Sequence, residues 1–397
     1  MERKLQNAVA VAYGRSPIAK ANKTGALRTA HPVDLAGYVL AKVIERAGLQ
    51  PSDIEDVVVG CSKPEGLQGL NIARLIASRA GCGWGVPGMT LNRFCASGLQ
   101  AISTAANMIA AGQADIVAAG GVELMSRMGQ NSASDVLCGW TIENDPGMYT
   151  PMGITAENVA EKYGVTRQEM DVFAVESHRR AAAAIENGYF DDEIIPVPGV
   201  DVEGTPITFS KDQGVRSDTS LEALAGLKTP FKESGRVTAG QSSQISDGTA
   251  FIILMSEDKA KELQISPIAR FLGFAVTGTD PKIMGIGPVD AVPKVLKMTG
   301  LSIDDIDVIE LNEAFAAQAI PCIRELGLDM KKVNSNGGAI ALGHPTGATG
   351  AILSCKALGD LKRTGGRYAL ISMCVGGGMG AAGIWYMSQN SSLSPGI

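Results

Sequence analysis

The sequence predicts an α/β protein built from two similar halves, and three observations support this class. One motif occurs twice: AGLQPSDI at 47–54 precedes the apolar run DVVVG, and TGLSIDDI at 299–306 precedes DVIELN. Each copy follows a Pro-Val-Asp sequence that would begin a helix. Each is followed by Gly-rich turns, an Ala-rich helical stretch and a further apolar strand, an order that predicts sheets covered by helices. Chance similarity is the alternative, but the repeated order of elements argues against it.

A polar segment at about 123–243 interrupts the repeated pattern and predicts an inserted loop domain. It contains the turn sequence Asn-Asp-Pro-Gly at 144–147, an amphipathic helix expected over 167–187, and short strand-like pieces after that helix. Long connections at the strand ends of α/β folds commonly hold the ligand. We therefore expect an N-terminal half at 1–266, which includes the insertion, and a C-terminal half at 267–397.

Composition narrows the class of function. The net charge of −6 argues against a general nucleic-acid binder. Seven cysteines without a CxxC pair fit free thiols in a reducing compartment, and His31, His178 and His344 are too widely spaced to predict a zinc site. His178, on the predicted insertion helix, is expected at the surface. No run approaches the roughly 18 apolar residues of a membrane span, and no signal peptide is evident, so we expect a soluble cytoplasmic protein.

Cys95 is the first candidate catalytic residue. It lies in NRFCASG, between a strand-like run and the Ala-rich helical stretch that follows. A thiol at a helix N-terminus meets free amide donors and the positive end of the helix dipole, and both favour the thiolate. The alternative fate of a free cysteine is that of a small buried apolar residue. We expect that alternative for the cysteines outside such a context, namely Cys61, Cys82, Cys138, Cys322 and Cys355.

Two Gly-rich stretches in the second half could supply partners for this thiol. His344 lies in GGAIALGHPTGATGA before a proline, so we expect a loop imidazole that is available as a general base. Cys374 follows the strand-like YALISM and precedes VGGGMG, whose amides could stabilise an oxyanion, cradle a phosphate or simply turn. Asn312, in ELNEAFAAQ, ends a strand, and a plain helix cap is an equal alternative for it. Together these residues favour acyl transfer through a cysteine thioester.

These stretches resemble the thiolase family across nearly the whole chain. Four motifs match in order: NRFCASGLQ, NEAFAAQ, GHPTGATGA and CVGGGMG. The resemblance implies a duplicated thiolase fold in α-β-α-β-α layers with an inserted loop domain, and usually a homodimer or homotetramer. It also implies cleavage of a 3-ketoacyl-CoA by CoA to acetyl-CoA and a shortened acyl-CoA. No metal or cofactor is implied, because coenzyme A is a substrate.

The resemblance assigns roles to particular residues. Cys95 matches the nucleophile that carries the acyl group, and His344 matches its base, which also contributes to an oxyanion hole. Asn312 matches a residue that holds a water in that hole, and Cys374 matches a second acid/base. The amides of Cys95 and Gly376 match a second oxyanion hole. Further positions resemble contacts with pantetheine and CoA, with Arg216 near the nucleotide end: Met152, Arg216, Phe231, Ser243, Met284, Ala314 and Phe315.

Details of the motifs favour the degradative 3-ketoacyl-CoA branch, which acts in fatty acid beta-oxidation and could have a multienzyme partner there. Pro151 stands where the biosynthetic branch usually has histidine, and the last loop reads CVGGGMG rather than CIGGGQG. Against this, HPTGATG differs from the HPLGCTG common in the degradative branch. A biosynthetic enzyme specific for acetoacetyl-CoA is therefore the alternative.

Two other kinds of protein remain as alternatives. A ketoacyl-carrier-protein synthase shares the architecture but uses one cysteine and usually two histidines. A non-catalytic thiolase-like protein that binds acyl-CoA would be expected to lose Cys95, His344 or Cys374, and all three are present.

Overall fold

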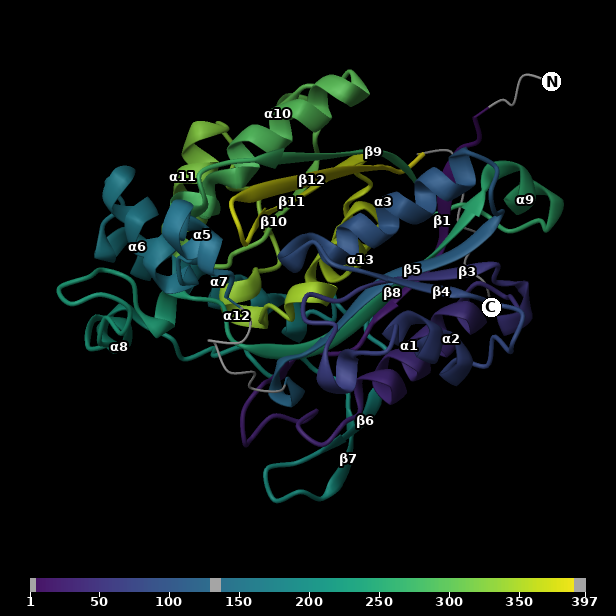
Figure 1. Ribbon diagram of the computed structural model, residues 1–397, viewed down its shortest axis with the longest axis horizontal. Coiled ribbons are helices and arrows are strands. Elements are labelled where there is room, and N and C mark those ends of the chain that lie inside the picture. The colour runs from purple at the N-terminus through teal and green to yellow at the C-terminus, as the bar shows by residue number, and fades with distance from the viewer. Residues whose placement is uncertain (1–4, 129–136, 389–397) are drawn as a thin grey trace.

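A ten-stranded sheet forms the centre of the protein (Figure 1). The computed structural model describes residues 5–128 and 137–388. The strands lie in the order β10-β11-β12-β9-β1-β8-β5-β3-β4, and β2 pairs with β8. Their bounds are β1 (Ala8–Arg15), β2 (Ala19–Lys20), β3 (Asp56–Gly60), β4 (Gly88–Leu91), β5 (Ile116–Leu124), β8 (Ser246–Ser256), β9 (Ala269–Gly278), β10 (Val308–Leu311), β11 (Tyr368–Val375) and β12 (Met379–Tyr386).

The pattern of strand pairing occurs twice along this sheet. In the first half, β3 is parallel to β5, β5 antiparallel to β8, and β8 antiparallel to β1. In the second half, β10 is parallel to β11, β11 antiparallel to β12, and β12 antiparallel to β9. The halves meet where β1 pairs with β9 through two residue pairs, Val9–Arg270 and Ala10–Ala269. The duplicated α/β fold that the internal repeat predicts is confirmed.

Helices cover both halves in layers. Helices α1 (Pro32–Arg46) and α2 (Ile72–Arg79) pack on the first half of the sheet, and α10 (Gly287–Thr299) packs on the second. Helices α3 (Ser97–Ala110) and α13 (Thr346–Thr364) contact each other and strands of both halves, and Figure 1 shows them between the two parts of the sheet. The layers are therefore helix, sheet, helix, sheet and helix, as the sequence resemblance implied.

The two central helices approach each other closely. A Cβ on Gly98 would lie 2.8 Å from the amide nitrogen of Ala351, and a Cβ on Gly350 would lie 2.3 Å from that of Leu99. Both distances are shorter than a carbon and a nitrogen tolerate, so only glycine fits at these positions. Part of the Gly-rich character of both motifs is thus explained by this backbone contact between α3 and α13.

The insertion lies between β5 and β8, and its longest element is the predicted helix. Helix α7 (Arg167–Glu186) begins at a capping box in which Thr166 and Glu169 bond reciprocally. The other described elements here are three α-helices, a hairpin and three short 3-10 helices: α5 (Gly139–Asn144), α6 (Met152–Lys162), α8 (Leu221–Ala225), β6 (Val197–Val200), β7 (Pro206–Phe209), η4 (Met125–Arg127), η5 (Pro146–Tyr149) and η6 (Ala239–Gln241). The predicted boundary at 266/267 falls between α9 (Glu257–Glu262) and β9, and it stays a prediction.

Two expectations about single residues are wrong. His178 is 1% exposed, because α7 packs against α11 (Ala316–Glu325) and α12 (Ala339–Leu342) and because the Arg216 amide donates a hydrogen bond to its Nδ1 at 3.1 Å. Cys138 is exposed rather than buried, since it caps the short helix α5 at the surface. In the described ranges, no helix combines the length and apolarity needed to cross a membrane.

Candidate active site

Cys95 lies in a tight turn, Phe94–Ala96, directly before α3. Phe94 has a φ of 42°, a left-handed conformation that is uncommon for a bulky residue. Neighbouring polar side chains hold this conformation: the Asn92 Oδ1 accepts from the Phe94 amide at 2.7 Å, and the Ser97 hydroxyl donates to the Phe94 carbonyl at 2.7 Å. The turn thus places the thiol at the start of the central helix, as the sequence predicted.

The environment of Cys95 keeps its thiol protonated in the resting protein. Burial raises the pKa of Cys95 to about 11, while hydrogen bonds from the amides of Gly376 and of Cys95 itself act in the opposite direction. These two residues come from different halves of the chain, and both line the same cavity. Their amides are the pair that the resemblance assigned to an oxyanion hole, and this common position fits that assignment.

His344 is a buried imidazole with a hydrogen-bond partner at each ring nitrogen. It lies in the loop between α12 and α13 and is 6% exposed. Its Nδ1 lies 2.6 Å from the Thr349 hydroxyl, which donates its only proton to the Pro345 carbonyl at 2.9 Å. Together with the Asn312 amide nitrogen near Nε2, this arrangement favours the tautomer of the neutral imidazole that has its proton on Nδ1 and its lone pair on Nε2. Burial lowers the pKa of His344 to about 4, so the ring is neutral at pH 7.

Asn312 and Cys374 lie near these two groups. The Asn312 Nδ2 lies 3.4 Å from the His344 Nε2, and its buried Oδ1 has no hydrogen-bond partner among the described residues. Such a buried acceptor is suited to a water or a ligand. Cys374 lies within β11, near its end, rather than after it. Its thiol has a pKa well above the usual range, because it is buried and because the Cys95 sulfur is close.

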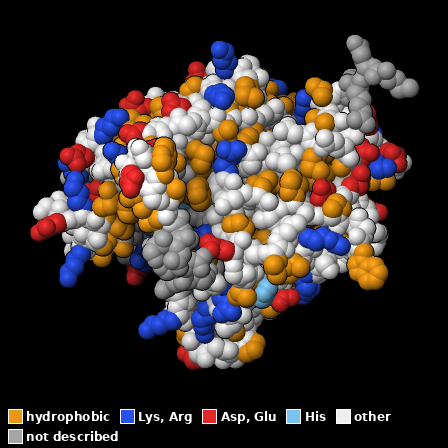
Figure 2. All heavy atoms as spheres, viewed as in Figure 1, with side chains coloured by type: hydrophobic (Ala, Val, Ile, Leu, Met, Phe, Trp, Pro, Cys, Tyr) orange, Lys and Arg blue, Asp and Glu red, His pale blue; other side chains and the backbone are white. Residues whose placement is uncertain are grey.

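A cavity of about 510 Å³ opens beside Cys95. Most of its wall is apolar, and the flexible side chains of four methionines contribute to it. The outer wall comes from α5 and α6, where Figure 2 shows hydrophobic side chains gathered at the surface. An apolar chain attached to the thiol would fit here. The lining residues are Ser62, Lys63, Phe94, Cys95, Met125, Met128, Thr141, Met148, Tyr149, Met152, Thr346, Gly376 and Gly377.

Most of the other predicted contacts lie around this centre. Met152 and Gly376 line the cavity. Cys374 packs in a small apolar cluster with three of the predicted contact residues, one from the short helix η7 (Pro281–Ile286) and two from the motif NEAFAAQ: Met284, Ala314 and Phe315.

Two more of the predicted contact residues, Phe231 and Ser243, touch this cluster at Phe315 and Ala314, whereas Arg216 does not. The Phe231 ring meets the Phe315 ring edge-on at 6.1 Å, and the Ser243 amide donates to the Ala314 carbonyl at 2.9 Å. Arg216 lies on the loop beside α7 and does not line the cavity.

Sequence reasoning missed several polar residues of the site. Thr349, whose hydroxyl lies beside the Nδ1 of His344, is five residues beyond it in the same motif. Glu123 is fully buried at the end of β5 and binds Ser62 and Thr346, which line the cavity. A signal for Glu123 was available, because it is the only charged residue of the strand IVAAGGVEL, all of which is buried.

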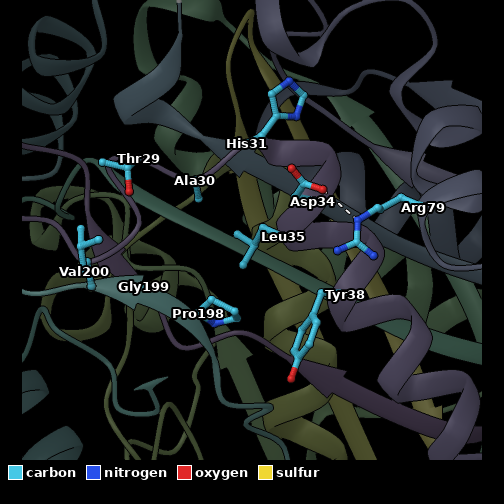
Figure 3. Close-up of a pocket in the computed structure, with 11 residues that line it drawn as sticks. Thr29, Ala30, His31, Asp34, Leu35, Tyr38, Arg79, Pro198, Gly199 and Val200 are labelled. Atoms are coloured by element: carbon cyan, nitrogen blue, oxygen red, sulfur yellow. Dashed lines mark hydrogen bonds and ion pairs between the residues drawn. The ribbon is translucent and has the colours of Figure 1, made fainter. Parts of the chain in front are cut away.

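A second cavity, of about 290 Å³, lies away from these residues (Figure 3). It is formed by α1, α2 and the hairpin strand β6, and the Asp34–Arg79 ion pair of 2.8 Å lies on its wall. His31 contributes to the wall and caps α1 by accepting from the Val33 amide at 3.3 Å. None of the predicted catalytic residues lines this cavity.

A duplicated α/β fold with a buried cysteine and histidine at its two central helices defines a class of acyltransferases. The family model "Thiolase, N-terminal domain" matches residues 8–258, and "Thiolase, C-terminal domain" matches residues 265–386. The chain therefore belongs to the thiolase family.

Individual relatives are similar over almost their full length. The chain is 46% identical to a 3-ketoacyl-CoA thiolase of Bacillus subtilis, over 96% of this chain and 99% of that protein. The crystal structure of the Bacillus anthracis acetyl-CoA acetyltransferase matches with a TM-score of 0.89 at 42% identity, covering 97% of this chain and all of that one. Human mitochondrial 3-ketoacyl-CoA thiolase in complex with CoA matches with a TM-score of 0.88 at 36% identity, covering 96% and 98%.

Proposed function

We propose that this acyltransferase is a degradative 3-ketoacyl-CoA thiolase that works through a thioester on Cys95. The observation that carries the proposal is the position of Cys95, which lies directly before the central helix α3 at the wall of an apolar cavity that Gly376 also lines. A neutral imidazole is held by Asn312, whose Nδ2 lies 3.4 Å from Nε2, and by Thr349, whose hydroxyl lies 2.6 Å from Nδ1. The substrate is a 3-ketoacyl-CoA, and the second substrate is CoA.

In the first half-reaction, the Cys95 thiol gives its proton to the His344 Nε2, and the sulfur attacks the 3-keto carbon. The oxyanion that forms is stabilised by preorganised donors. The bond between C2 and C3 then breaks, and its electron pair leaves with the acetyl-CoA fragment as an enolate. The buried Cys374 thiol, which holds its proton tightly, protonates C2 and releases acetyl-CoA. The acyl group remains on Cys95.

In the second half-reaction, CoA enters and its thiol loses a proton to the Cys374 thiolate. The CoA sulfur attacks the thioester carbonyl, and the amides of Cys95 and Gly376 stabilise the tetrahedral oxyanion. Collapse of this intermediate expels the Cys95 sulfur, which recovers its proton from His344. The products are acetyl-CoA and an acyl-CoA shortened by two carbons, and the two-step course predicts ping-pong kinetics.

The apolar cavity supports the degradative subtype over the acetoacetyl-CoA-specific alternative. Acetoacetyl-CoA leaves only an acetyl group on the cysteine, which does not need the wall of Met125, Met128, Met148 and Met152. The B. subtilis relative is named a 3-ketoacyl-CoA thiolase, whereas the B. anthracis neighbour is named an acetyl-CoA acetyltransferase. Thiolysis rates for a series of 3-ketoacyl-CoA chain lengths separate the two subtypes. Activity confined to acetoacetyl-CoA would overturn the degradative assignment.

The central test is capture of the acyl-enzyme. Brief exposure to a 3-ketoacyl-CoA without free CoA should add one acyl mass to the protein, and peptide mapping should place it on Cys95. Cys95→Ala should abolish both the label and thiolysis, with a loss of activity of about 10⁴-fold or more. Cys138→Ala, which removes an exposed thiol outside the cavity lining, is the matched control and should keep both. A label on another residue of an active preparation would contradict the mechanism.

We further propose that the chain forms at least a homodimer through the free edge of β4. This strand ends the sheet and pairs only with β3 in the strand order. Around it, large apolar side chains are exposed, with Trp84 at 96% and Leu70 at 91%. An unpaired strand edge beside exposed apolar residues favours pairing with another chain. The seven cysteines are all free, which supports action in a reducing compartment such as the cytoplasm.

A further inference from the structure

A buried carboxylate connects the two halves at the wall of the cavity. Glu123, on β5 of the first half, is 0% exposed. From the same half, the Ser62 amide donates to its Oε2 at 2.8 Å, the Ser62 hydroxyl at 2.5 Å, and the Gln68 side-chain amide donates to its Oε1 at 2.6 Å. None of these donors is a cation. The carboxylate is held by hydrogen bonds alone.

Two further donors come from the other half. The Gly347 amide donates to the Glu123 Oε2 at 2.8 Å, and the Thr346 hydroxyl donates to it at 3.1 Å. Both belong to the first turn of the 19-residue helix α13, whose free amides and dipole favour an anion there. The approach is close, because a Cβ on Gly347 would lie 2.6 Å from the carboxylate oxygen. Any larger residue at 347 would push the helix start away.

These bonds bear on the position of His344. The histidine precedes Thr346 by two residues, and Ser62 and Thr346 line the same cavity as Cys95. Asn312 and Thr349 orient the imidazole, but both belong to the same half as His344. They cannot set the distance between the base and a nucleophile that lies in the other half. Glu123 binds groups from both halves at this point.

We propose that Glu123 is a positioning residue that fastens the start of α13, and with it the His344 loop, to the half that carries Cys95. The inference rests on the proposed function, in which His344 is the base for Cys95. Glu123 also acts at a distance on the thiol. Burial is the main cause of the raised pKa of Cys95, and the negative charge of Glu123 adds to it.

The test is Glu123→Gln, which keeps the size of the side chain but removes its charge and presents an amide to donors. A base displaced from its nucleophile should lower kcat for thiolysis by about 10- to 100-fold, with little change in KM. In the same variant, loss of the charge should let iodoacetamide alkylate Cys95 faster at each pH below the pKa of the thiol. A slower enzyme with a more reactive thiol is an outcome that general destabilisation does not produce.

A matched control is Glu310→Gln, since Glu310 is another fully buried carboxylate, paired with Lys356 at 2.8 Å on β10. This change should lower the melting temperature without shifting the alkylation profile of Cys95. If Glu123→Gln does not fold, Thr346→Val removes one donor from the second half and should lower kcat in the same direction by a smaller factor.

Unchanged kcat and an unchanged alkylation profile in folded Glu123→Gln would overturn the proposal. So would a loss of activity that tracks only the melting temperature. This failure is distinct from failure of the proposed function, in which the wild-type protein itself forms no thioester on Cys95.

Discussion

The two halves share a scaffold but carry different chemistry. Asp56 pairs with Val117 in the first half, and Val308 pairs with Ala369 in the second, so both pairs are related by the offset of 252 residues that relates Gly48 to Gly300. The central helices also begin alike, with Cys-Ala-Ser-Gly at 95–98 and His-Pro-Thr-Gly at 344–347. Cys95 and His344 each precede the first helical residue by two positions. The proposed nucleophile and base thus occupy equivalent sites.

The halves differ at the strand ends. The same offset of 252 residues makes Gly60, at the end of β3, the equivalent of Asn312. It makes Val122, on β5, the equivalent of Cys374. The first half therefore has no polar side chain at either position. Its contribution is the thiol and most of the cavity wall, whereas the second half holds the groups that the mechanism uses for proton transfer. The duplicated fold places a helix start in each half, and in the proposed mechanism one start carries the donor and the other the acceptor of a proton.

Among the variants that test this comparison, the largest effect is expected from removing the proposed second acid/base. Cys374→Ser should slow thiolysis by about 10²- to 10⁴-fold, because a hydroxyl does not readily supply a stable anion for the return proton transfer, while Cys95 still accepts an acyl group. Thiolysis rates with free CoA measure the first effect, and the mass of the acyl-enzyme formed without free CoA measures whether Cys95 is still acylated.

The comparison between halves supplies the control for that prediction. Adding Val122→Cys to the Cys374→Ser variant places a thiol at the equivalent strand position of the first half and should restore nothing. Restoration of activity would show that the two positions are interchangeable, and unimpaired Cys374→Ser would remove Cys374 from the mechanism.

A smaller effect is expected from a charge beside the imidazole. The pKa of His344 is lowered to about 4 by burial, so the neutral base persists in the free enzyme down to about that pH, and kcat/KM should fall only below it. In Asn312→Asp, a carboxylate near Nε2 favours the imidazolium and raises this pKa, which moves the acidic limb of the pH–rate profile upward. Asn312→Ala, which adds no charge, should lower the rate without moving the limb.

The smallest effect on activity is expected at the edge of the sheet, where the halves also differ. The first half has the additional strand β4, whereas the second half has only an isolated bridge between Ile309 and Val333 at the corresponding place. Trp84→Glu should reduce the molar mass measured by light scattering, with little change in activity per subunit. Trp140→Glu, which alters another exposed tryptophan, should leave the mass unchanged. An unaltered mass in Trp84→Glu would exclude the β4 edge as the contact.

Local sequence signals predicted the scaffold well. The repeat at 47–54 and 299–306 predicted two similar α/β halves, and the pattern of the insertion predicted α7 and short strands after it. The positions of Cys95 and His344 just before a central helix were predicted because helix starts have local signatures in glycine, proline and small residues. These features depend on residues that are close in the sequence, so the sequence alone is enough to predict them.

Features that depend on distant contacts were not predicted. The residues next to His178 in the sequence give no sign that its side chain is buried. It is buried only because α7 packs against α11 and α12. The bonds from Glu123 to Thr346 and Gly347 cross more than 200 residues of sequence, and no local pattern records such a pairing.

The glycine contacts between α3 and α13 have a mechanical consequence. Gly98 and Gly350 face backbone atoms of the opposite helix, so at this crossing point the two backbones are in direct contact. The seam between the halves should therefore be stiff, and its amide hydrogens should be among the last in the protein to exchange with solvent. Substrates would then have to reach Cys95 from the outer surface along the methionine-lined cavity, since the seam itself would not open to admit them.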